Sequence, residues 1–345
     1  MKHIISLFEL EDVDCKILPF GNGLINSTWQ VECGIKKYIL QKINGQIFKQ
    51  PEDIACNIRL IDDYLKKNFP TYLFASPCST VTGNDLVKTE NGYYRMFPFI
   101  VNSRTIDIVE NPQQAYEAAK QFAGLTKLLL GLDADQLKIT IPDFHNLSLH
   151  YLQFEKALET GSSEKIEQSK DLITAINQNK SIVDKYKINK TKFKIRITHH
   201  DTKISNVLFN ETDKGLCVID LDTVMPGYFI SDVGDMMRTY LCPVSEEEKD
   251  FSKISVRSAF YAAIVSGYLS EMGAELNEVE KRYFHYAGEF MIYMQAIRFL
   301  TDYINNDTYY GAKYEGQNFI RAGNQITLLK CFQNSKCSNS FNDFI

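Results

Sequence analysis

One stretch, residues 198–222, constrains the fold of this chain most, because polar side chains alternate there with short apolar runs. The last two apolar runs, 207–209 and 216–219, flank an Asp-Lys-Gly segment. Asp and Gly tolerate the left-handed backbone angles of tight turns, so the two runs predict a β-hairpin. Such a hairpin would bring Asn206 and Asp220 to the same end of neighbouring strands.

The polar residues of this stretch have the spacing of a phosphoryl-transfer site. Such a site needs a carboxylate that faces the attacking hydroxyl and oxygen ligands for magnesium on the nucleotide side. His199, Asp201 and Asn206 follow the His-x-Asp-x-x-x-x-Asn order of the kinase catalytic loop, and Lys203 occupies its lysine position. We therefore predict Asp201 and Lys203 as catalytic residues, and Asn206 and Asp220 as the metal ligands. The alternative is a polar turn with coincidental acids.

Length and charge limit the other possibilities. A chain of 345 residues is long for one compact core, so two lobes are expected. The formal net charge of −5 argues against general binding to nucleic acids or anionic membranes. No apolar run approaches the ~20 residues of a membrane span, and the first residues lack a secretory pattern. We expect a cytoplasmic protein, a monomer or weak dimer, with no nucleic-acid or membrane partner.

The eight cysteines show no C-x-x-C pairing. Cysteines scattered without motif spacing are typical of small buried side chains in a reducing compartment. We therefore expect neither a zinc site nor disulfides.

The N-terminal part of the chain predicts a small sheet that binds a nucleotide. Three short strands are separated by glycine turns, at residues 16–20, 29–33 and 37–43. Gly21 and Gly23 would let a loop backbone approach the nucleotide phosphates closely, and Asn26 follows in the same loop. An ordinary turn would explain the glycines equally well, and it is the Asp-Asn-Asp set further along the chain that favours a nucleotide loop.

The third strand should deliver a cation to the phosphates, paired with a glutamate on the next helix. Alignment with the kinase strand puts Gln41 at the lysine position and Lys42 one step away, on the opposite face. Either Gln41 makes the contact as an amide, or the register shifts by one residue and Lys42 makes it. The helix predicted at residues 51–68 offers Cys56 and Asn57 in its middle, where the glutamate is expected.

A further strand ends in an aromatic segment with the character of a hinge. Phe97 and Phe99 flank a proline there, and adenine would lie against them and bond to free backbone groups. The chain then becomes mainly helical. We therefore predict an N-lobe of residues 1–100, a hinge at about 97–103 and a C-lobe of residues 104–345.

The C-terminal helices carry the candidate acceptor surface. Three helices are expected after the central stretch, at residues 247–272, 276–303 and 319–333. Flat rings suit the C–H face of a sugar and forked polar groups suit its paired hydroxyls, although helix packing would account for the tyrosines equally well. The candidate substrate-binding residues are Asp222, Arg298, Asp302, Tyr303 and Tyr310. Asp222 is alternatively a second metal ligand.

Asp232 has two possible roles: it either caps the next helix or braces the catalytic loop.

On these residues the chain resembles the aminoglycoside phosphotransferase and choline kinase superfamily, and within it the bacterial N-acetylhexosamine 1-kinases. The likeness extends over nearly the whole chain, through residues 23–28, 38–44, 141–145, 198–203, 218–227 and 298–303. The resemblance implies an α+β, bilobal fold like that of protein kinases. A small antiparallel sheet with one helix would form the N-lobe, and a larger, mainly helical part the C-lobe.

The resemblance also implies ATP and Mg²⁺, and phosphorylation of N-acetylglucosamine or N-acetylgalactosamine at the anomeric hydroxyl. Asp201 matches the catalytic Asp of the family, Asn206 and Asp220 its metal ligands, and Lys203 the lysine beside the transferred phosphate.

Three alternatives remain open from the sequence. The first is the same chemistry on another small alcohol, such as an amino alcohol, homoserine or an aminoglycoside. The second is a metal-dependent phosphoesterase that uses His199, His200, Asp201, Asp220 and Asp222. The third is a catalytically dead binding module.

Overall fold

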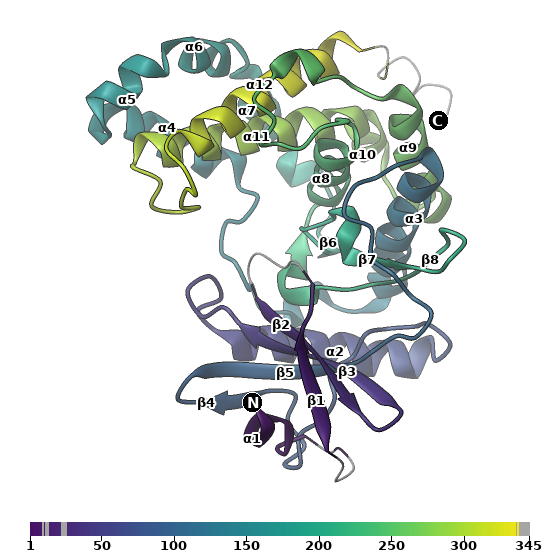
Figure 1. Ribbon diagram of the computed structural model, residues 1–345. Helices are drawn as coiled ribbons and strands as arrows, with labels where there is room; N and C mark the ends of the chain where they lie inside the picture. The colour runs from purple at the N-terminus through teal and green to yellow at the C-terminus, as the bar shows by residue number, and fades with distance from the viewer. Residues whose placement is uncertain (9, 11–13, 22–25, 336, 338–345) are drawn as a thin grey trace.

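A five-stranded antiparallel sheet forms the N-terminal part of the protein, in the order β1-β2-β3-β5-β4 (Figure 1). The computed structural model describes residues 1–8, 10, 14–21, 26–335 and 337. The sheet and its two helices are α1 (Lys2–Ile5), β1 (Cys15–Pro19), β2 (Ser27–Cys33), β3 (Lys36–Ile43), α2 (Pro51–Asn68), β4 (Val87–Thr89) and β5 (Gly92–Pro98).

The two faces of this sheet have different partners, because successive side chains of a strand point to opposite faces. Leu40 of β3 packs in a small core with α1, whereas Ile43 joins the large core that contains α2 and the C-terminal helices. Gln41 is an even number of positions from Ile43, so it lies on the face that is turned toward the rest of the molecule.

The expectation that no disulfide forms is wrong, because the structure joins Cys15 to Cys33. These residues are direct partners in the β1–β2 register, with their Cα atoms 4.4 Å apart. The spacing of 18 residues carries no motif signature, and only the strand pairing reveals the contact.

The remainder of the chain is mainly helical (Figure 1). Two short two-stranded sheets lie within it: β6 (Arg196–Thr198) pairs with β9 (Met225–Gly227), and β7 (Val207–Phe209) pairs with β8 (Gly215–Val218). The helices are α3 (Pro112–Leu128), α4 (Leu147–Thr160), α5 (Ser163–Gln168), α6 (Lys170–Gln178), α7 (Ser181–Asn189), α8 (Phe229–Tyr240), α9 (Ser258–Met272), α10 (Glu278–Arg282), α11 (Phe284–Ile304) and α12 (Gln317–Asn334). Short 3₁₀ turns are η1 (Leu129–Gly131), η2 (Ala134–Gln136), η3 (Lys190–Lys192), η4 (Ile204–Asn206), η5 (Leu221–Thr223) and η6 (Phe251–Lys253).

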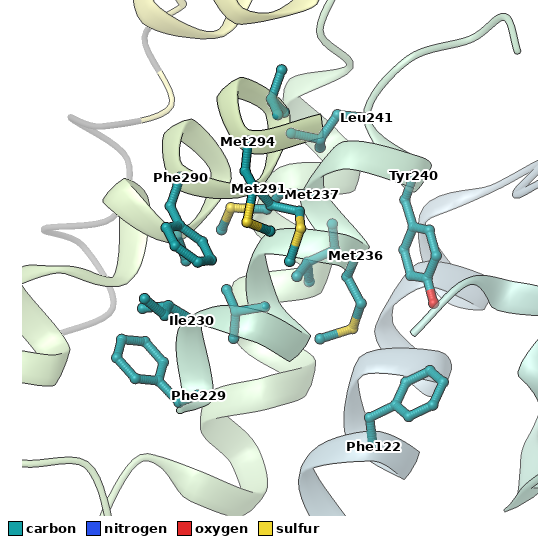
Figure 2. Packing of buried hydrophobic residues seen from close by; sticks show 14 of the residues in the cluster. Phe122, Phe229, Ile230, Met236, Met237, Tyr240, Leu241, Phe290, Met291 and Met294 are labelled. Atoms are coloured by element: carbon teal, nitrogen blue, oxygen red, sulfur yellow. The ribbon is translucent and has the colours of Figure 1, made fainter. Parts of the chain in front are cut away.

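Helix α8 runs through the large core, and its buried residues Asp232 and Asp235 contact the loop at residues 199–202. Figure 2 shows Met237 of α8 next to Met291 and Met294 of α11 within this core. A side chain at Gly234 would collide with the carbonyl of Ala287, so α8 and α11 approach closely at this point. This packing fixes α8 as a rigid support for the loop that precedes it.

Two of the predicted C-terminal helices differ from the structure. The helix expected from residue 247 begins at Ser258, because Asp250 caps η6 and a loop follows. The helix expected at 276–303 is divided into α10, which starts with a capping box at Asn277, and α11, which follows Tyr283.

The antiparallel sheet and the larger helical part agree with the expected α+β fold class.

Helix α2 ties the sheet to the helical body. The Asn57 amide nitrogen donates to the carbonyls of Lys138 at 2.8 Å and Val224 at 3.1 Å, and its oxygen accepts from the Lys138 backbone at 2.7 Å. Where the chain leaves β5, Arg104 and Phe209 exchange backbone hydrogen bonds of 2.8 and 2.9 Å.

Within the described residues, no helix has the length and apolarity required to cross a bilayer.

Candidate active site

The predicted hairpin is present as β7 and β8. Val207 pairs with Val218, and the amide of Ile219 donates to the carbonyl of Asn206 at 2.9 Å. Asp213 adopts a left-handed conformation (φ 60°) in the turn, as its residue type favours. The residues that follow Ile219 therefore emerge beside Asn206, at one end of both strands.

Asp201, Lys203 and Asn206 lie in direct contact. Lys203 Nζ donates to Asp201 Oδ2 at 2.9 Å, and Asn206 Nδ2 donates to the same oxygen at 3.0 Å and to the Asp201 carbonyl at 2.8 Å. The Asp201 and Lys203 side chains are 26% and 42% exposed, so both remain accessible to a ligand. The structure thus brings together the catalytic residues predicted from the sequence spacing.

The charges of this cluster hold Asp201 ionised. Burial would raise the pKa of Asp201, but Lys203, His199 and the amide of Asn206 together lower it below its usual value. Burial would likewise lower the pKa of Lys203, and the carboxylates of Asp201 and Asp220 raise it instead. The site therefore contains an ionised carboxylate beside a protonated amine.

Asp220 faces this cluster from the end of β8. Its Oδ2 is 3.9 Å from Lys203 Nζ, and its backbone is left-handed (φ 59°), a conformation that costs of order 1–3 kcal/mol in a non-glycine residue. Burial, with a smaller contribution from the charge of Asp222, raises the pKa of Asp220 to about 6. Strain of this kind is typical of functional positions, where the fold enforces the direction of a side chain.

Asn206 and Asp220 fit the requirements of a magnesium ion. Because the amide nitrogen of Asn206 is bonded to Asp201, its amide oxygen is turned the other way. A carboxylate with one further protein oxygen is the sparse ligand set that Mg²⁺ uses when phosphate oxygens and water complete its shell.

Asp232 braces the catalytic loop from behind. Its two oxygens accept hydrogen bonds from the backbone amides of His199 at 3.0 Å and His200 at 2.8 Å. The residue that flanks α8 at its N-terminus is Tyr228, and Asp232 lies within the helix, so the bracing alternative is confirmed. Asp235, three positions further along the same helix, accepts from the Thr202 amide at 2.8 Å. The loop is therefore held by α8.

The glycine-loop residues lie only partly within the described chain. Gly21 has a positive φ of 75°, whereas Gly23 lies outside the described residues. Asn26 is inside, and its amide nitrogen donates to Asp222 Oδ2 at 2.8 Å while its oxygen accepts from the Asn44 amide at 3.0 Å. The end of the loop is thereby attached to the helical body.

Gln41 and Lys42 lie on opposite faces of β3. Gln41 pairs with Arg95 in the register of β3 and β5 and faces the helical body. Lys42 pairs with Tyr94, and its ammonium lies 6.0 Å from the centre of that ring. Of the two candidates, only Gln41 shares a face with the side chains that contact Asp222.

The predicted hinge residues mark the end of β5. The amide of Phe99 donates to the carbonyl of Lys37 at 3.0 Å, and its ring lies 6.2 Å from that of Phe20. Phe97 lies on the same face of the strand as Arg95, and the Arg95 guanidinium is 5.0 Å from the centre of the Phe97 ring.

Comparison with known proteins identifies the family. Residues 16–273 match the phosphotransferase enzyme family (APH). The chain belongs to this family. The match spans the sheet, the loop at residues 198–206 and the β7–β8 hairpin, and it confirms the superfamily that the motifs indicated.

Solved structures resemble this phosphotransferase over almost its full length. Spectinomycin phosphotransferase APH(9)-Ia, in complex with ADP and spectinomycin, is 13% identical with a TM-score of 0.59, over 96% of this chain and 97% of that one. An aminoglycoside phosphotransferase from Alicyclobacillus acidocaldarius is 11% identical with a TM-score of 0.65, over 100% and 96%. A microcompartment-associated aminopropanol kinase is 12% identical with a TM-score of 0.62, over 99% and 97%. At these identities the likeness establishes the fold, which is the expected protein-kinase-like one.

In this phosphotransferase, Arg298 is surrounded by aromatic rings. Its guanidinium carbon lies 5.4 Å from the ring centre of Phe144, 5.6 Å from that of Tyr309 and 5.4 Å from that of Tyr310. The adjacent His145 approaches His200 of the catalytic loop, with 3.3 Å between their Nδ1 atoms. The aromatic group around Arg298 is therefore linked to the loop that carries Asp201.

Two other predicted substrate residues have structural contacts. Asp302 accepts hydrogen bonds from the backbone amides of Tyr309 at 2.7 Å and Tyr310 at 2.9 Å, so it shapes the loop that presents these rings. Tyr303 is 6% exposed, and its hydroxyl donates to Gln168, the last residue of α5. The structure does not bring Tyr303 together with Arg298.

Asp222 and Arg95 form a buried ion pair between the helical body and the sheet. Arg95 was missed from the sequence, and so was its link to Asp222. The available signal was a charged residue inside the apolar run of β5, since a buried guanidinium requires acceptors. The carboxylate of Asp222 therefore contacts Arg95 and Asn26 in this structure.

Proposed function

We propose that this phosphotransferase is an ATP- and Mg²⁺-dependent kinase that phosphorylates the anomeric hydroxyl of an N-acetylhexosamine, N-acetylglucosamine or N-acetylgalactosamine, to give the sugar 1-phosphate. The observation that carries the proposal is the contact of Asp201 with Lys203 and Asn206, with Asp220 facing the same ammonium. Family membership supports phosphoryl transfer. The structural relative in complex with ADP supports a nucleotide donor.

Asp201 would orient the sugar hydroxyl and accept its proton during attack on the γ-phosphate. The neighbouring ammonium keeps the carboxylate ionised and therefore able to accept. A positioned base of this kind typically contributes ~10²–10⁴-fold in rate.

Asn206 and Asp220 would hold the metal, which when bound neutralises and orients the phosphate oxygens. Lys203, which lies between Asp201 and Asp220, would stabilise negative charge on the transferred phosphoryl group. The backbone of the loop that starts at Gly21 would approach the phosphates of the nucleotide from the sheet, with adenine beside Phe97 and Phe99.

The group around Arg298 supports a sugar acceptor. A guanidinium among Phe144, Tyr309 and Tyr310 offers a planar donor next to flat apolar faces, which is the combination that binds paired hydroxyls and the C–H face of a pyranose. Tyr310 accepts from Gln295 at 3.0 Å, and Gln295 accepts from Arg298 at 3.3 Å, so these polar groups form one network.

The test is acceptor-dependent ADP formation with purified protein, ATP and Mg²⁺. N-acetylglucosamine and N-acetylgalactosamine are compared with homoserine, aminopropanol, choline and an aminoglycoside, and ³¹P NMR identifies the phosphorylated oxygen. Turnover with an N-acetylhexosamine and a 1-phosphate product is expected. Turnover with an amino alcohol or aminoglycoside alone would replace the sugar assignment, and phosphate release without any acceptor would indicate a phosphoesterase.

A further inference from the structure

A row of polar side chains crosses the sheet on the face that is turned toward the helical body. Thr28 of β2 pairs with Gln41 of β3, and Gln41 pairs with Arg95 of β5. Gln41 stands where kinases place the strand lysine that contacts the nucleotide phosphates. The row therefore lies where the donors of a nucleotide site are required.

Arg95 is held on two sides and is 2% exposed. Its Nε and Nη2 donate to Gln41 Oε1 at 3.0 and 2.9 Å, and its Nη1 forms the ion pair with Asp222. Both charges of the ion pair are almost completely buried, with 2% and 3% of the side chains exposed. In this arrangement Arg95 acts through the groups that it contacts, because a phosphate has no access to it.

The orientation of the Gln41 amide follows from the chemistry of arginine. A guanidinium has donors and no acceptor, so the amide must turn its oxygen to Arg95 and its nitrogen away. The nitrogen is directed to the other end of the row, where it lies 3.4 Å from the Thr28 hydroxyl. Gln41 is half-buried, and its second amide proton has no hydrogen-bond partner among the residues that the structure describes.

We propose that Gln41 donates its second Nε2 hydrogen to the phosphates of a nucleoside di- or triphosphate, and that Arg95 is the positioning residue that fixes this orientation. Asp222 neutralises Arg95 and attaches the row to η5, next to the metal-side Asp220. Kinases have a lysine–glutamate pair here, and this chain has Gln41 and Cys56 at the two corresponding positions. The buried Arg95–Asp222 pair takes the place of that lysine–glutamate pair. This inference rests on the proposed function, since it assigns the nucleotide subsite of the same enzyme.

The sharpest variant is Gln41→Glu, which has nearly the same shape. A carboxylate can still accept both hydrogen bonds from Arg95, so the fold is expected to persist, but it lacks donors and repels phosphate. The dissociation constant of ADP is measured by calorimetry with Mg²⁺ and without acceptor, and a rise of about tenfold or more is expected. Gln46→Glu, in the exposed loop after β3, makes the same change in net charge and serves as the matched control.

The role of Arg95 is tested with a single variant at Arg95 and a double variant at Gln41 and Arg95. Arg95→Gln alone removes the fork that orients the amide, so ADP binding should weaken. The double variant Gln41→Lys with Arg95→Gln restores the usual strand lysine beside Asp222 and should recover ADP affinity. A purely structural role for Arg95 predicts instead that ADP binding weakens only as far as the folded fraction falls, which the Tm of each variant measures.

The outcomes separate the inference from the function on which it rests. Wild-type protein that fails to bind ADP would overturn both. Wild-type protein that binds ADP, together with Gln41→Glu that binds it within twofold, would overturn the inference and leave the proposed kinase intact.

Discussion

Lys203 Nζ lies 2.9 Å from Asp201 Oδ2 and 3.9 Å from Asp220 Oδ2, so one ammonium joins the base predicted from the catalytic loop to the metal ligand predicted from the hairpin. The two carboxylates are 19 positions apart along the chain, and the turn between β7 and β8 brings them together.

Asp201→Asn is expected to fold normally and to lower kcat by ~10²–10⁴-fold, because an amide cannot accept the hydroxyl proton. ADP affinity should change little, since Asp201 is proposed to contact the acceptor hydroxyl. Steady-state kinetics with calorimetric ADP binding distinguish the two effects. Wild-type turnover in this variant would remove Asp201 from the mechanism.

Asp220→Asn is expected to abolish the gain in ADP affinity that Mg²⁺ confers, while ADP binding without metal is retained. The amide is a weaker ligand for a hard cation than the carboxylate. Calorimetric titrations of ADP with Mg²⁺ and with EDTA measure the difference. Asp171→Asn, at an exposed position of α6, is the control for charge. An unchanged response to Mg²⁺ would contradict the assignment of the metal ligand.

Asp232→Ala leaves the amides of His199 and His200 without their acceptor, at a cost of about 2 kcal/mol or more in the free energy of unfolding. Both Tm and kcat should fall, because the catalytic loop loses its support. Asp232→Asn keeps one acceptor oxygen and should lie between the alanine variant and wild type. Equal kcat in all three proteins would show that the loop is held by other contacts.

Arg298→Lys should raise KM for the acceptor by about tenfold and leave KM for ATP unchanged, since lysine cannot reproduce the planar fork. Steady-state kinetics with each substrate varied in turn provide the measurement. The same replacement at Arg282, which is exposed on α10, is the control. An effect on KM for ATP instead would place Arg298 at the nucleotide.

The burial of His285 predicts that the protein loses stability in acid. Burial lowers the pKa of its imidazole to about 4, and the ring lies flat against Phe332 at 4.4 Å. The unfolded chain has a histidine pKa of about 6.5, so between pH 6.5 and 4 it binds a proton that the folded protein does not. The free energy of unfolding should therefore fall as the pH falls through this window.

His285→Gln removes that titration, and its free energy of unfolding should depend less steeply on pH over the same window. Urea unfolding at about pH 7 and pH 5 measures both slopes, with the exposed His3→Gln as control. Equal slopes in wild type and His285→Gln would contradict the prediction.

Much of the fold could be predicted because its signals are local. Helix α2 begins at its proline and ends where expected, and β3 differs from its predicted range by one residue. The boundaries of the C-terminal helices were less accurate, since capping at Asp250 and Asn277 interrupts long apolar patterns. The disulfide was missed because cysteine spacing does not reveal which strands pair.

The sequence by itself determined the spacing of Asp201, Lys203 and Asn206 and the hairpin that returns the chain at Asp220, because these relationships depend on a short loop and one tight turn. Only the tertiary structure decided what surrounds them. Asp222 meets Arg95 across 127 positions, and Asp232 reaches back to the amides of the catalytic loop. Such contacts join elements that are far apart along the chain and meet only in the packed structure, and no periodicity or motif along the chain records them.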